Sequence, residues 1–96
     1  VAIGPVLVTA SAIGAVEMLT MQVRVNGETR MEAQPAALAK PLDRTIESLT
    51  LDGTLLPGDI IASGIAGAAE ANRSLKRGDI IELEIEKIGV LRNRVL

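Results

Sequence analysis

The sequence predicts a mainly β fold with one short helix, in the α+β class. Apolar and polar side chains alternate over residues 18–25 and again over residues 80–86, which is the period-two pattern of strands with one buried and one solvated face. Residues 42–51 instead carry apolar side chains at helical spacing. Gly, Pro and Asn residues separate these segments, so we expect short elements within a single domain that spans residues 1–96.

Two hairpins are predicted from turn residues. Asn26 and Gly27 both tolerate positive φ, which a type I′ turn requires at its two central positions, so an antiparallel strand should follow over residues 28–32. Near the end of the chain, Gly89 is expected at the bend of a second hairpin. The last strand is then predicted over residues 90–95.

The helix is predicted to begin at Pro41, whose fixed φ suits a first helical position. Leu42, Ile46 and Leu49 follow at spacings i, i+4 and i+7, so their side chains should form one apolar stripe. Gly53 lies just beyond the last apolar position. It is expected to adopt the left-handed conformation that commonly ends a helix.

The pattern Leu-x-x-Gly-Asp-Ile-Ile occurs twice, beginning at Leu55 and Leu75. Each Gly-Asp pair is interpreted as a strand-entry turn in which the Asp side chain bonds the backbone amides that follow it. The two turns would lead into strands over residues 60–63 and 80–86. A further short buried strand is predicted at Val6–Val8, because that run is continuously aliphatic.

The composition argues against several classes of protein. The net charge is −2, with basic residues scattered along the chain and no aromatic residue to stack on bases, so a nucleic-acid partner is not expected. No apolar run approaches the roughly 18 residues of a membrane span, and no signal peptide is evident, so no membrane partner is expected. The absence of Cys fits a reducing cytoplasm, and we expect a cytoplasmic protein. Without Cys or His the chain can form neither disulfides nor a serine hydrolase triad.

Several motifs along the chain have a characteristic order and spacing. They are Gly4-Pro5, Asn26-Gly27, residues 55–64, residues 75–82 and residues 88–95. Together these motifs resemble the C-terminal half of the fumarylacetoacetate hydrolase family. The resemblance implies a β-rich roll or barrel-like half-domain. It also implies a metal-dependent enzyme of small diketo or 2-hydroxy-dienoate acids, acting by C–C hydrolysis, isomerisation or decarboxylation.

The same resemblance places the catalytic centre elsewhere. The family holds Mg or Mn with a Glu-x-Glu pair and an Asp that lie upstream of the motif found here at Gly4-Pro5, so no catalytic residue and no metal ligand is expected in this chain. The cofactor belongs to the complete family enzyme. Glu82, Glu84 and Glu86 form the only Glu-x-Glu-x-Glu run of the sequence. They are interpreted as the solvated face of a strand, with a cation site as the alternative.

A substrate-binding loop is implied at Ser63, Gly64, Ile65 and Gly67. In the family this position reads Thr-Gly-Thr-Pro-x-Gly and lies at the mouth of the active site, where small residues let the backbone approach a ligand. Here Ile65 replaces the second Thr and removes its hydroxyl. A plain glycine-rich bend is therefore an equal alternative.

Residues 77–79 read Arg-Gly-Asp, the tripeptide of integrin ligands, but its position in a strand-entry turn favours a structural role. Three functions remain open: a fragment or subunit of a fumarylacetoacetate hydrolase-like enzyme that is inactive alone, a designed or excised β-domain without catalytic function, and a binding module that uses residues 63–69. The missing His, Cys and aromatic residues suit the second. The expected partners are a second copy of the chain or a complementing N-terminal half, with a small-molecule substrate once the enzyme is complete.

Overall fold

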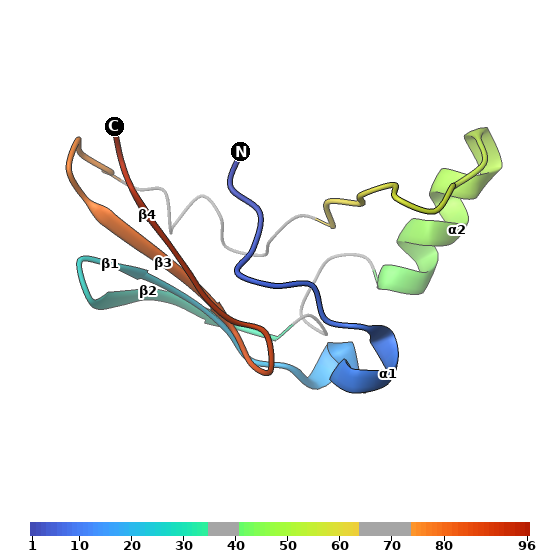
Figure 1. The fold of residues 1–96 in the computed structure, drawn as a ribbon, viewed down its shortest axis with the longest axis horizontal. Coiled ribbons are helices and arrows are strands. Elements are labelled where there is room, and N and C mark those ends of the chain that lie inside the picture. The colour runs from blue at the N-terminus through green and yellow to red at the C-terminus, as the bar shows by residue number, and fades with distance from the viewer. Residues whose placement is uncertain (35–40, 64–73) are drawn as a thin grey trace.

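The computed structural model describes residues 1–34, 41–63 and 74–96, and its elements are labelled in Figure 1. In chain order they are α1 (Ala10–Ile13), η1 (Val16–Met18), β1 (Met21–Val25), β2 (Glu28–Ala33), α2 (Leu42–Asp52), β3 (Ile80–Ile85) and β4 (Gly89–Arg94). The predicted fold class is confirmed. None of the helices in these ranges has the length and apolarity that a membrane span requires.

The four strands form one antiparallel sheet in the order β2-β1-β3-β4. The two central strands, β1 and β3, are far apart in the chain, and the register pairs Val23 with Leu83. Both outer pairs are hairpins of consecutive strands, as predicted. The structure starts β1 at Met21 rather than at residue 18, because residues 16–18 form the short helix η1.

The hairpin between β1 and β2 has the predicted turn. Asn26 and Gly27 have φ values of 51° and 82°, as a type I′ turn requires. In the hairpin between β3 and β4, Gly89 has a φ of 115° but is already the first residue of β4. The bend itself lies at residues 86–88, where Lys87 also has positive φ.

The sheet has one apolar and one polar face. Val23 and Val25 of β1 are buried on the apolar face, and Ile13 and Leu19 extend the same small core beyond the end of the strand. The N-terminal segment passes close over β4, since a Cβ atom at Gly89 would lie 3.3 Å from the Cγ of Pro5. The alternation of residues 80–86 places the Glu side chains of β3 opposite this face, but all six residues of β3 are half-buried, so the predicted contrast between a buried and a solvated side is absent in β3.

Two predicted strands are wrong. Val6–Val8 and residues 60–63 run without strand structure, and neither pairs with another strand in the described ranges. Leu7 is 97% exposed and Ile60 is 77% exposed. Aliphatic residues favour extended backbone, but a strand also needs a neighbouring strand to satisfy its amide and carbonyl groups, and neither segment has one in the described ranges.

The predicted helix is confirmed as α2, but its expected C-terminal cap is wrong. Gly53 has φ −176° and ψ 177°, which is extended backbone that any residue adopts. The apolar stripe is only partly covered: Ile46 is 46% and Leu49 is 44% exposed. Figure 1 shows α2 standing well apart from the sheet, so the helix and the sheet do not share a core.

Both Gly-Asp turns adopt the expected backbone, with φ of 100° at Gly58 and 94° at Gly78. Their hydrogen bonds run opposite to the predicted direction. The Oδ2 atoms of Asp59 and Asp79 accept bonds from the amides of Leu56 and Lys76, which lie three residues before each Asp, at 2.8 Å in both cases. The repeat therefore encodes one turn geometry used twice.

Replacing Gly78 by Val should lower the free energy of unfolding by about 1 kcal/mol or more, because a β-branched residue is strained at positive φ. No heavy atom lies within 4 Å of a Cβ built there, so the cost should come from the backbone alone. Thermal melts followed by far-ultraviolet circular dichroism measure it. Gly53→Val is the matched control, since that position is equally open but extended, and an equal loss in both variants would contradict the explanation.

Candidate functional site

The predicted substrate loop is described only at its first residue. Ser63 is exposed and lies at the end of the described range 41–63, in backbone without helix or strand. Gly64, Ile65 and Gly67 lie outside the described residues. The predicted contact between this loop and a substrate therefore stays a prediction.

A charged cluster centred on Arg24 occupies the polar face of the sheet. The Arg24 guanidinium donates from Nη1 to Glu84 Oε2 at 2.6 Å and from Nε to Glu82 Oε2 at 3.2 Å. Arg92 approaches the other oxygen of Glu82, with 3.8 Å between Nε and Oε1. Strand register creates the cluster, because Arg24 pairs with Glu82 and Glu82 pairs with Arg92 across three neighbouring strands.

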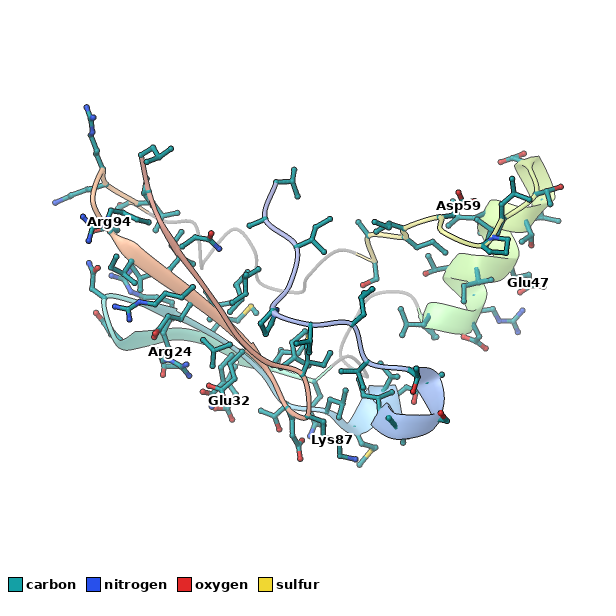
Figure 2. The ribbon with its side chains drawn as sticks, viewed as in Figure 1. Arg24, Glu32, Glu47, Asp59, Lys87 and Arg94 are labelled. Carbon is teal, nitrogen blue, oxygen red and sulfur yellow. The ribbon has the colours of Figure 1, made fainter. Side chains whose placement is uncertain are left out.

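The cluster continues to the far edge of the sheet through Gln22. The Gln22 side chain accepts a bond from Arg24 Nη1 at 3.0 Å and donates one to Glu32 Oε2 at 2.7 Å. Figure 2 shows Arg24 and Glu32 on the side of the sheet that faces away from the N-terminal segment. Hydrogen bonds that Arg24 donates to Glu84, and then to Glu82, raise the pKa of Arg24 above its ordinary value, so its charge is permanent.

These contacts bear on the two interpretations of the acidic run. Glu82 and Glu84 are both bonded to Arg24, and Glu86 lies beyond the end of β3, where its carboxylate accepts a bond from the amide of Thr20 at 3.3 Å. In the parts of the chain that the structure describes, no group of three His, Cys, Asp or Glu side chains is placed to hold a metal ion. The described residues thus do not fit a Mg or Mn site, which favours the interpretation as a polar strand face, although that face is only partly solvated because the Glu82 side chain is 24% exposed.

A partly open hollow of about 180 Å³ lies beside this cluster, lined by Thr20, Gln22, Glu84 and Glu86. Its floor is the polar surface of β1 and β3. Its amide and carboxylate groups already bond to the side chains of Arg24 and Glu32 or to the Thr20 amide. The carboxylate oxygens that line the hollow therefore already accept hydrogen bonds within the chain.

Asp79 joins three parts of the sheet. Its Oδ1 accepts a bond from Asn26 Nδ2 at 2.9 Å, and Asn26 Oδ1 in turn accepts the amide of Ile80 at 2.9 Å. The Asp79 carbonyl accepts the amide of Val95 at 2.9 Å. Hydrogen bonds from the Lys76 amide, and next from Asn26, hold the pKa of the Asp79 carboxyl below its usual value. This carboxylate is committed to its own chain, which favours the structural role of the Arg-Gly-Asp sequence.

Sequence reasoning missed the side-chain contacts of Gln22, Arg24 and Asn26. Arg24 was recognisable only as one polar position in an alternating strand. The missing information was the partner strand, since nothing local to residues 18–25 indicates that Glu82 and Glu84 lie opposite. Lys87 was missed as well: its ammonium donates to the carbonyl of Ile13 at 3.2 Å and ties the β3–β4 turn to α1, as can be followed in Figure 2.

Comparison with known proteins gives a family match along the whole chain. Residues 1–96 match the family described as fumarylacetoacetate (FAA) hydrolase C-terminal. The chain belongs to the fumarylacetoacetate hydrolase family. It is 38% identical over 96 residues to the oxaloacetate tautomerase YisK of Bacillus subtilis (strain 168), a match that covers 96% of this chain and 32% of the relative. It is 36% identical over 89 residues to a maleylpyruvate hydrolase of Aquipseudomonas alcaligenes, covering 93% and 30%.

Solved structures of the fumarylacetoacetate hydrolase family have the same fold. The maleylpyruvate hydrolase of Sphingobium sp. SYK-6, also solved in complex with manganese(II) ion and pyruvate, superposes with a TM-score of 0.87 at 31% identity, covering 97% of this chain and 34% of that one. The fumarylacetoacetate hydrolase of Exiguobacterium antarcticum gives a TM-score of 0.82 at 31% identity, covering 96% and 34%. The chain thus spans about a third of the length of these relatives.

The Asp79 hydrogen bonds predict an acid-dependent loss of stability. Because folding lowers the pKa of this carboxyl, its contribution is fully present above the unfolded value of about 3.9 and is lost as pH falls through the lower folded value. The melting temperature should therefore fall between about pH 5 and pH 2. Asp79→Asn should be less stable at neutral pH and should lose less on acidification, whereas Asp52→Asn, which removes the same charge from the end of α2, should follow the unmodified chain.

Proposed function

We propose that this chain forms the C-terminal part of an enzyme that acts on a small diketo or 2-hydroxy-dienoate acid. The reaction would be C–C hydrolysis, isomerisation or decarboxylation. The observation that carries the proposal is the family match along all of residues 1–96, supported by relatives that act as an oxaloacetate tautomerase and as maleylpyruvate hydrolases. The substrates in those names are small anionic oxo acids.

The metal and acid/base groups of such an enzyme would come from a complementing N-terminal part, on the same or another polypeptide. In this chain the acidic residues of β3 are held by Arg24, and the described residues do not fit a Mg or Mn site. No step of the reaction is therefore assigned to a metal bound by this chain. Its proposed contribution is a rigid sheet beside the active site, with residues 63–67 forming part of the wall around the substrate.

Ser63, Gly64, Ile65 and Gly67 are the proposed wall residues. Small side chains let backbone amides approach an anionic substrate closely, and the Ser63 hydroxyl offers one further polar contact. Ser63 follows the exposed segment after Asp59, whose turn is held by its own side chain. The Asp59 side chain thus fixes the turn that lies four residues before Ser63, the first wall residue.

The isolated chain is expected to show no turnover of oxaloacetate tautomers or maleylpyruvate above a metal-only blank. The reason is that its strand carboxylates are already paired with Arg24. An ultraviolet assay with added Mg²⁺ or Mn²⁺ measures this. Turnover that disappears in Glu82→Gln or Glu84→Gln would contradict the proposal, because it would make these carboxylates a site.

A chimera tests the positive half of the proposal. The segment of the Bacillus subtilis oxaloacetate tautomerase that matches this chain is replaced by residues 1–96, and tautomerase activity is measured with Mn²⁺. We expect activity well above that of the relative with the segment deleted, because this chain would restore the missing part of the fold.

Two controls make the chimera decisive. Gly78→Val in the chimera should lower its melting temperature, which reports whether the grafted sheet is folded. Ser63→Ala should raise KM if residues 63–67 line the substrate. A folded chimera with no activity would overturn the proposed function.

A further inference from the structure

Asn26 is the only asparagine of the sequence that precedes a glycine. This pair is prone to deamidation, because a glycine has no side chain to shield its amide nitrogen as it attacks the neighbouring carboxamide. Asn26 and Gly27 are both exposed at the tip of the β1–β2 hairpin, at the end of the sheet away from α1 (Figure 1). No heavy atom of the described residues lies within 4 Å of a Cβ built at Gly27, so water reaches the pair freely.

Hydrogen bonds to the start of β3 hold Asn26 in place. The Asn26 amide donates to the Ile80 carbonyl at 2.8 Å, and the Ile80 amide donates to Asn26 Oδ1 at 2.9 Å. Asn26 Nδ2 donates to Asp79 Oδ1 at 2.9 Å. The carboxamide thus continues the β1–β3 ladder one position beyond its last paired residues, Val25 and Ile81.

The turn also keeps the reacting atoms apart. Asn26 has a φ of 51°, and the first central residue of a type I′ turn has a ψ of about +30°. At that ψ the nitrogen of Gly27 lies on the opposite side of the Asn26 Cα–C bond from Cβ. Attack on Cγ requires this nitrogen beside Cβ, so the chain must first leave the turn and release the carboxamide from β3.

We propose that Asn26 is a deamidation site of this protein and that its contact with Asp79 controls the rate of the reaction. The amide nitrogen of Gly27 forms a bond to Asn26 Cγ and gives up its proton to solvent. The Cγ–Nδ2 bond breaks, and the amino group takes up a proton and leaves as ammonia. Water then opens the cyclic imide at one of its carbonyls, which gives aspartate or isoaspartate. The inference does not depend on the proposed enzymatic function.

The product should separate the hairpin tip from β3. A carboxylate at position 26 has no proton to donate, so it loses the bond to Asp79 and faces a second negative charge. Isoaspartate also routes the main chain through the former side chain, which adds a further carbon atom to the backbone of the turn. The ladder between β1 and β3 then loses the contacts that hold its end.

Incubation of the folded chain in mildly alkaline buffer, followed by peptide mass mapping, tests the site. The peptide that contains Asn26 should gain the mass difference between NH2 and OH. The peptide that contains Asn93 should not, because Asn93 is exposed as well but precedes the bulky Arg94. In guanidinium chloride, where the contacts of Asn26 are lost, its deamidation should be faster. No mass gain at Asn26, an equal gain at Asn93, or equal rates in the folded and unfolded chain would overturn the proposal.

Asp79→Ala tests the control of the rate. Loss of the bond to Asn26 should accelerate deamidation about fivefold, the factor that corresponds to one net hydrogen bond. Val23→Ala is the matched control, because it opens a cavity beside a buried position of β1 and lowers stability while the contacts of Asn26 remain. Both variants are compared at temperatures where circular dichroism shows them folded. No acceleration in Asp79→Ala, or an equal acceleration in a Val23→Ala chain of the same melting temperature, would overturn control by this contact.

An exchange of the two side chains covers the case in which Asp79→Ala fails to fold. Asn26→Asp should lower the melting temperature, because aspartate accepts the same turn but cannot donate to Asp79. When Asp79→Asn is added, the new amide can donate to position 26 while its oxygen still accepts the amide of Lys76. The double variant should therefore lose less than the sum of the two single variants. An Asn26→Asp chain as stable as the unmodified one, or strictly additive losses, would overturn the role of this contact.

Discussion

The antiparallel pairing of β1 with β3 is the contact on which the remaining geometry depends. It joins segments 58 residues apart at Arg24 and Glu82, and closing such a loop costs entropy that only a long, well-matched ladder recovers. The pairing brings both Glu82 and Glu84 to one guanidinium and places Asn26 beside Ile80. A shift of this register by one residue would turn the charged cluster into the core and expose Val23.

The parts of the fold that the sequence predicted correctly are those with local causes. Asn26 and Gly27 specify their turn through the backbone angles they tolerate, and the helical spacing of Leu42, Ile46 and Leu49 indicates α2. Val6–Val8 had the same kind of local signal for a strand but lacks a neighbouring strand among the described residues. Propensity describes which backbone a segment accepts, whereas strand formation depends on a partner that may come from anywhere in the chain.

The candidate site was less predictable than the fold for the same reason. The carboxylates of a Glu-x-Glu run can either bind a metal ion or form ion pairs with basic side chains. Here they pair with Arg24, which is far away in the sequence. The family resemblance anticipated that this run is not the metal site, but it gave no indication of what the carboxylates do instead. Three of the four proposed substrate residues, Gly64, Ile65 and Gly67, lie outside the described ranges, so their role stays a prediction.

The two outer strands have a consequence for how the protein can associate. Within the described residues, β2 and β4 form the edges of the sheet, and unpaired strand edges invite the addition of strands from other molecules. Both edge strands carry charged residues: Glu28, Arg30 and Glu32 on β2, and Arg92 and Arg94 on β4. A further strand that paired with either edge would have to dehydrate some of these charges. The charged side chains at both edges thus disfavour the addition of a further strand there.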